Sequence, residues 1–112
     1  MKQDPVSLGF AALADPTRRA ILAHLLRGEA SVGQLAAPFD LSLPAITKHL
    51  KVLEKAGLIS RSRNSQWRPC HIEPQGFQPV VSWLSQMQRQ WEQRLDRLEE
   101  YLKQFNEDEL KN

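Results

Sequence analysis

The chain has 112 residues, a formal net charge of +2 and a single cysteine. That length supports one domain with one hydrophobic core, and one cysteine excludes an intrachain disulfide. Neither an apolar signal-peptide core nor a run long enough to cross a bilayer is present, so we expect a cytoplasmic protein.

The charged residues are unevenly distributed along the chain. Residues 41–73 hold six basic and two acidic residues, a net charge of +4, whereas residues 76–112 hold five basic and seven acidic residues, a net charge of −2. A basic middle beside an acidic end favours a surface for a polyanion and a separate structural element.

Two helices are predicted at the N-terminus, and both begin with the same local signal. In Asp4-Pro5 and again in Asp15-Pro16, an N-capping aspartate precedes a proline at the first helical position. Apolar residues then recur at helical spacing to about residue 14 in the first helix and through residue 26 in the second.

Two further helices are predicted to form a helix-turn-helix. Ser31 and Gln34 have the spacing of a capping box at the start of a short helix over residues 32–38. Ser42 is predicted to cap the next helix, and Gly57 to end it in a left-handed conformation. Two short helices with a tight link are typical of this motif.

The helix that follows Ser42 has two contrasting faces. Ile46, Leu50 and Leu53 fall on one stripe at 100° per residue, so we expect this stripe to face the core. The opposite face carries lysines and no acid, and we predict that it contacts DNA; a solvated surface helix is the alternative. The predicted DNA-binding residues of this helix are Ser42, Pro44, Thr47, Lys48, Lys51 and Lys55.

A β-hairpin is predicted after Gly57. Residues 58–63 and 66–72 have the pattern of two strands around a turn at Asn64-Ser65, because asparagine tolerates a positive φ. A two-stranded arm after a helix-turn-helix is a wing, and we predict that it contacts DNA; arginines that merely protect a sheet edge are the alternative. Its predicted DNA-binding residues are Arg61, Arg63, Asn64 and Arg68.

A long amphipathic helix is predicted from about residue 79 to residue 105, after which the chain is polar. Its apolar positions are separated by steps of three and four residues. A helix of this length extends past a core built from short elements, so we expect its stripe to pack against its own copy; packing wholly within the monomer is the alternative. The predicted dimer-interface residues are Phe10, Leu13, Leu84, Met87, Trp91, Leu95, Leu98 and Leu102.

The predicted fold class is mostly α with a small β-hairpin. It is a winged helix-turn-helix with a long C-terminal dimerisation helix. We expect a single domain over residues 1–112, with the helix-turn-helix at about 31–57, the wing at about 58–73 and the dimerisation helix at about 79–105.

This arrangement resembles the ArsR family of bacterial winged-helix repressors. The resemblance rests on ALADPTRRAIL at 12–22, LAAPF at 35–39, SLPAITKHLKVL at 42–53 with GLI at 57–59, and WEQRLDRL at 91–98. It covers about residues 6–105 and implies a homodimer that binds an inverted-repeat operator in double-stranded DNA and represses transcription. It also implies base reading by Thr47 and Lys48 and phosphate contacts by the wing, although Ser65 and Gln66 replace a glycine and an arginine common there.

Metal sensing is not expected. Metal-sensing members of the family carry a Cys-x-Cys pair in the helix before the turn, where this chain has Ala36 and Pro38. Other members place Asp and His ligands on the last helix, and here no histidine follows His71. One cysteine and three scattered histidines do not make a site for a borderline metal. We therefore predict a member of the subgroup without metal-sensing cysteines, with no metal, no cofactor and an unknown effector.

Three other functions remain for comparison. An enzyme is not expected, because the sequence shows no nucleophile with a base, no pair of carboxylates and no phosphate loop. A winged-helix module that binds protein without DNA should have an apolar or mixed outer helix face. A thiol-responsive repressor that uses Cys70 would require a resolving cysteine or a lowered thiol pKa.

Overall fold

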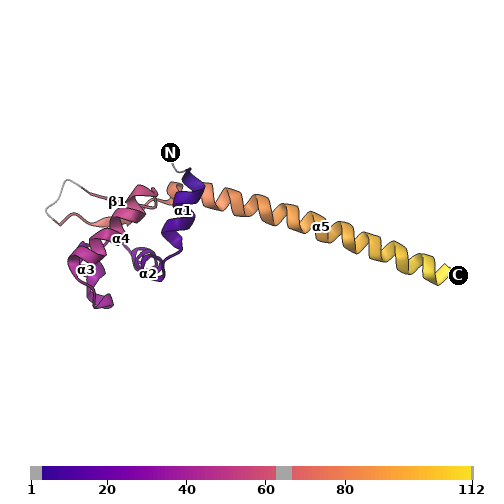
Figure 1. Cartoon of the computed structure of the whole chain (residues 1–112), viewed down its shortest axis with the longest axis horizontal. Helices are drawn as coiled ribbons and strands as arrows, with labels where there is room; N and C mark the ends of the chain where they lie inside the picture. The colour runs from indigo at the N-terminus through magenta and orange to yellow at the C-terminus, as the bar shows by residue number, and fades with distance from the viewer. Residues whose placement is uncertain (1–3, 63–66, 112) are drawn as a thin grey trace. The chain divides into compact units, whose positions relative to one another are not determined.

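The computed structural model describes residues 4–62 and 67–111, the side chains of 108–111 excepted, and confirms the predicted fold class (Figure 1). The chain divides into two compact units, Met1–Val80 and Val81–Asn112. The elements in chain order are α1 (Pro5–Leu13), α2 (Pro16–Leu25), α3 (Val32–Ala36), the 3-10 turn η1 (Ala37–Phe39), α4 (Leu43–Lys55), β1 (Ile59–Arg61), β2 (Cys70–Ile72), the 3-10 turn η2 (Pro74–Phe77) and α5 (Gln78–Lys111).

The predicted helix starts are confirmed by side-chain caps. Asp4 Oδ1 accepts from the Ser7 backbone N–H at 2.8 Å, and Asp15 Oδ2 accepts from the Arg18 backbone N–H at 3.0 Å. Ser31 forms both hydrogen bonds of its capping box, and Ser42 Oγ caps α4. Each cap satisfies a backbone donor that the first helical turn leaves free, and so fixes where its helix begins.

One hydrophobic core lies among α2, α3, α4 and the hairpin. The predicted inner stripe of α4 is confirmed, because Ile46, Leu50 and Leu53 have no exposed surface. Gly57 ends α4 with a φ of 77°, a left-handed conformation that glycine adopts without steric cost. Leu58 and Ile59 then return the chain to the core as the first residues of the hairpin.

The hairpin is shorter than predicted. Its strands pair antiparallel over three residues each, with Ile59 opposite Ile72 and Arg61 opposite Cys70. Cys70 also exchanges two backbone hydrogen bonds with Ala30, so the segment before α3 extends the sheet on its other edge. The predicted turn at Asn64-Ser65 lies outside the described residues.

A close approach between α1 and the first turn of α5 completes the first unit. A methyl group at Gly9 would collide with the side chain of Val80, which is only 4% exposed. The absence of a side chain at Gly9 therefore lets the two helices come together at this point.

Helix α5 continues through Lys111, beyond the predicted end near residue 105. From Val81 onwards its large apolar side chains are about half exposed, for example Trp91 at 60% and Leu98 at 53%. Glu99 and Lys103, four residues apart on α5, form an ion pair with 3.7 Å between Oε1 and Nζ. Within the described ranges, no helix combines the length and apolar character needed to cross a membrane.

Candidate nucleic-acid interface

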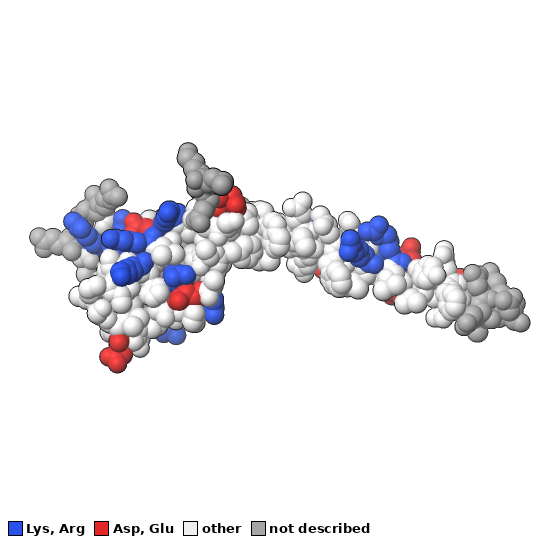
Figure 2. Space-filling view, in the orientation of Figure 1, with Lys and Arg blue, Asp and Glu red and all other residues white. Residues whose placement is uncertain are grey.

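The outer face of α4 carries three exposed lysines. Lys48, Lys51 and Lys55 are all exposed, and the opposite face of the helix is fully buried. Figure 2 shows basic side chains gathered over one side of the first unit. A rigid helix with one buried face holds these charges in a fixed arrangement, which suits contact with a regular polyanion.

The other predicted contacts on α4 lie near its N-terminus. Ser42 and Pro44 are exposed, and Thr47 is half-buried beside Lys48. The Ser42 hydroxyl oxygen already accepts from the Ala45 backbone N–H at 3.3 Å, so its first role is structural. The predicted contacts Arg63 and Asn64 lie outside the described residues.

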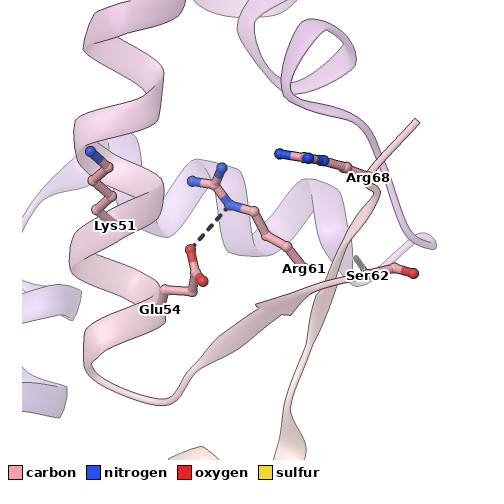
Figure 3. A pocket seen from close by; sticks show the side chains of 5 residues that line it. All are labelled: Lys51, Glu54, Arg61, Ser62 and Arg68. Atoms are coloured by element: carbon pink, nitrogen blue, oxygen red, sulfur yellow. Dashed lines mark ion pairs between the residues drawn. The ribbon is translucent and has the colours of Figure 1, made fainter. Parts of the chain in front are cut away.

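A cavity of about 420 Å³ opens between α4 and the hairpin (Figure 3). Arg61 extends from β1 towards α4, and its guanidinium lies between the ends of the Lys51 and Arg68 side chains. The lining residues are Lys51, Glu54, Arg61, Ser62 and Arg68. Three predicted DNA contacts thus meet at one cavity, together with one acid, Glu54, that was not predicted to belong to the site.

Arg61 is less accessible than its predicted role as a wing contact suggests. Its Nε lies 3.1 Å from Glu54 Oε1, and its side chain is only 24% exposed. The two groups form an ion pair without the alignment of a hydrogen bond. Glu54 therefore holds the Arg61 side chain against α4.

Arg18 ties the N-terminal helices to α4 and was missed from the sequence. Its Nε donates to the Ala12 carbonyl at 2.7 Å and its Nη2 to the Ala11 carbonyl at 2.9 Å. Its Nη1 lies 3.3 Å from Nδ1 of His49 on α4. A guanidinium can only donate, so this contact is a hydrogen bond in the tautomer whose Nδ1 carries no proton. His49 thus has a structural contact with Arg18.

Asp15 sits at the edge of the same cluster. Its Oδ2 lies 3.9 Å from His49 Nδ1. The pKa of the Asp15 carboxyl lies below its ordinary value, chiefly because the Arg18 backbone N–H donates to it, and the nearby His49 adds to the effect. The cap of α2 is therefore strongest in the ionised form.

Cys70 is fully buried in the core. Burial raises the pKa of its thiol, because the thiolate loses solvation in apolar surroundings. A buried, protonated thiol reacts slowly with oxidants, so the structure gives no support to thiol sensing through Cys70.

A serine, a histidine and a glutamate meet at the base of the hairpin, but not as a catalytic relay. Ser60 Oγ lies 2.7 Å from His71 Nε2 and also donates to Glu73. In a relay the histidine contacts the other two groups through its two different ring nitrogens, whereas here His71 Nε2 faces both Ser60 and, at 3.5 Å, Glu73 Oε1. The cluster cross-links β1 to the segment that leaves β2.

A second cavity of about 400 Å³ is almost wholly apolar. Its lining residues, from α2, β2 and η2, are Leu22, Leu26, Ile72, Pro74 and Phe77. With no polar group to orient a ligand, this cavity lacks the convergent donors and acceptors of a specific site.

Comparison with known proteins agrees with this geometry. The helix-turn-helix domain family matches residues 13–61. The transcriptional repressor SdpR of Bacillus subtilis (strain 168) is 36% identical over 75 residues, which cover 67% of this chain and 83% of SdpR. A solved structure, that of the ArsR family transcriptional regulator RHA00566, has a TM-score of 0.74 and 45% identity, and covers 80% of this chain and 98% of that one.

The chain belongs to the ArsR family. A further match is less complete: the HTH-type transcriptional regulator Rv2034 of Mycobacterium tuberculosis is 41% identical over 68 residues, 61% of this chain and 64% of that protein. As an ArsR-family member, the chain is a DNA-binding transcriptional regulator and not an enzyme. Among the described residues, no three His, Cys, Asp or Glu side chains come together as a metal site requires, and the absence of metal sensing remains a prediction.

Proposed function

We propose that this ArsR-family regulator is a cytoplasmic homodimeric repressor that binds an inverted-repeat operator through α4 and the wing. The observation that carries the proposal is α4 itself, whose exposed face bears Lys48, Lys51 and Lys55 while its opposite face is buried. A protein-binding surface would instead present apolar or mixed side chains there.

The residues on this surface divide into two roles. Thr47 and Lys48 lie early in α4, where a recognition helix brings side chains to base edges in the major groove. Lys51, Lys55 and the wing arginines lie where phosphate contacts are expected, and such contacts set orientation and affinity without reading sequence.

The dimer is supported by the apolar stripe of α5. Leu84, Leu95 and Leu102 are each 47–50% exposed, so the chain itself leaves them accessible to a partner. Full burial of one such side chain contributes about 1.5–3 kcal/mol, and association costs roughly 4–15 kcal/mol. Several leucines and Trp91 on each of two chains are enough to exceed that cost. Two recognition helices would then lie about one turn of DNA, ~34 Å, apart.

The experiment begins with selection of bound fragments from genomic DNA, followed by a salt titration on the selected duplex. If each protomer neutralises about three to five phosphates, the slope of log K against log salt should be roughly −5 to −9. A slope near zero would falsify the DNA interface.

A pair of lysine variants then separates the residues that read bases from those that contact phosphates. Lys48→Ala should weaken binding to the selected operator by about 1–3 kcal/mol more than binding to a random duplex. Lys55→Ala, on the same exposed face, is the matched control and should weaken both duplexes alike. Equal losses for Lys48→Ala would remove Lys48 from the base-reading residues.

A further inference from the structure

The cavity between α4 and the wing holds more positive than negative charge. Lys51, Arg61 and Arg68 line it, and Glu54 is the acid among its described lining residues. The net charge of this lining is +2, in a concave site where the charges cannot move far apart. Such a site favours an anion that can contact several cations at once.

The guanidinium of Arg61 has hydrogen-bonding capacity that the described residues do not use. Its Nη2 is buried and has no hydrogen-bond acceptor among the described residues. Nearly all buried donors in folded proteins have an acceptor, so the described residues leave the hydrogen-bonding capacity of this guanidinium partly unused. Glu54 contacts only the Nε edge of the same group, at 3.1 Å.

We propose that Glu54 is a positioning residue: it fixes the Arg61 guanidinium so that Arg61, Lys51 and Arg68 together hold one backbone phosphate of DNA. This inference rests on the proposed function. Lys51 is one turn beyond Lys48 on the exposed face of α4, so a duplex read by Lys48 would pass the cavity. A guanidinium held at one edge presents its remaining N–H groups to phosphate oxygens in a fixed geometry.

The positioning role of Glu54 can be recognised by whether neutralising Glu54 weakens or tightens binding to DNA. A carboxylate on a DNA-facing surface repels any duplex, so its neutralisation alone should tighten binding to every sequence. If Glu54 positions Arg61, its neutralisation should instead weaken operator binding, because the arginine is then free to adopt other rotamers. The two mechanisms therefore predict opposite results for one substitution.

The test is Glu54→Gln in the full chain, with affinity for the operator and for a random duplex measured by fluorescence anisotropy over a range of salt. We expect operator affinity to fall about two- to fivefold. The salt slope should flatten by roughly one for each protomer. Glu29→Gln removes the same charge from an exposed position outside the cavity and should leave both readouts unchanged. Tighter binding of Glu54→Gln to both duplexes, with an unchanged slope, would overturn the proposal.

A double-mutant cycle tests whether Glu54 acts through Arg61. In an Arg61→Gln background, Glu54→Gln should no longer weaken operator binding, because only the repulsion between the carboxylate and DNA is left to remove. If Arg61→Gln does not fold, judged by circular dichroism, Arg68→Gln replaces an exposed member of the cavity and should flatten the slope by the same amount. If the wild-type protein shows a steep salt slope on its operator and the Arg68 variant shows the same slope, the phosphate site is overturned and the proposed function stands. Loss of the steep wild-type slope would instead overturn the proposed function.

Discussion

Leu50 on α4 and Leu98 on α5 both belong to regular apolar stripes, but the chain covers only one of them. Leu50 has no exposed surface, whereas Leu98 is 53% exposed. The first unit buries its apolar stripe in its own hydrophobic core, whereas the apolar stripe of α5 stays accessible to solvent. The contrast indicates that α4 is rigid because of contacts within the chain, and it is consistent with the proposal that a second chain covers the stripe of α5.

The largest effect should come from a charge on the α5 stripe. Leu98→Glu would bury a carboxylate in the proposed dimer interface, where its desolvation is costly. The dimer should dissociate, and operator affinity should fall about 100- to 10,000-fold because each half-site is then bound separately. Light scattering and operator binding on the same samples measure both effects. Gln93→Glu, on another face of α5, is the control and should remain dimeric.

A cavity in the core beneath α4 should destabilise the first unit, and this loss of stability should not depend on dimerisation. Leu50→Ala removes fully buried methyl groups and should lower the free energy of unfolding by about 2–5 kcal/mol. Urea denaturation measures this loss. Leu98→Ala should instead cause a loss that grows as protein concentration rises from below to above the dissociation constant of the dimer, because dimerisation stabilises only the chains that have dimerised. A concentration-independent loss for Leu98→Ala would contradict the assignment of its stripe to a partner.

Loss of the Arg18 contacts that join α1 to α4 should have a smaller effect on stability. Arg18→Gln removes the charged donor to two carbonyls and to His49, and should cost about 1–3 kcal/mol of unfolding free energy. Arg19→Gln is the matched control, since Arg19 donates to the Leu13 carbonyl at an exposed site. Equal losses in the two variants, measured by thermal denaturation, would show that the contact with α4 contributes nothing.

The smallest effect concerns acid pH. The pKa values of Asp4 and Asp15 lie below the ordinary value of 3.8, chiefly because each carboxylate accepts a backbone N–H. Their contribution to stability is therefore complete above about pH 4 and is lost as pH falls through the lowered values. Asp15→Asn keeps an N-cap acceptor but does not titrate, so its melting temperature should fall less between pH 5 and pH 3 than that of the wild type. An identical decrease in both proteins would exclude Asp15 as a source of acid sensitivity.

Much of the first unit could be predicted because its signals are local. The caps at Asp4, Asp15 and Ser42 act within three residues, and the α4 stripe follows from helical periodicity. The ion pair of Glu54 with Arg61 joins a helix to a strand, and Arg18 contacts His49 across 31 positions. No periodicity encodes such contacts, since they arise only when the elements pack.

The pairing of Ala30 with Cys70 was missed for the same reason. A single backbone bridge has no side-chain pattern, and its position depends on how the segment before α3 meets the hairpin. The over-long predicted strands have a related cause: alternation and β-forming residues indicate an extended chain, but pairing is set by the partner strand.

The mass of the protein–operator complex tests the central claim most directly. Sedimentation equilibrium of the chain with its selected duplex should give two 12.8 kDa chains for each duplex, and the same two chains in the absence of DNA. A monomer that binds the full operator as one chain per duplex would contradict the account, because a single α4 would then be sufficient for recognition.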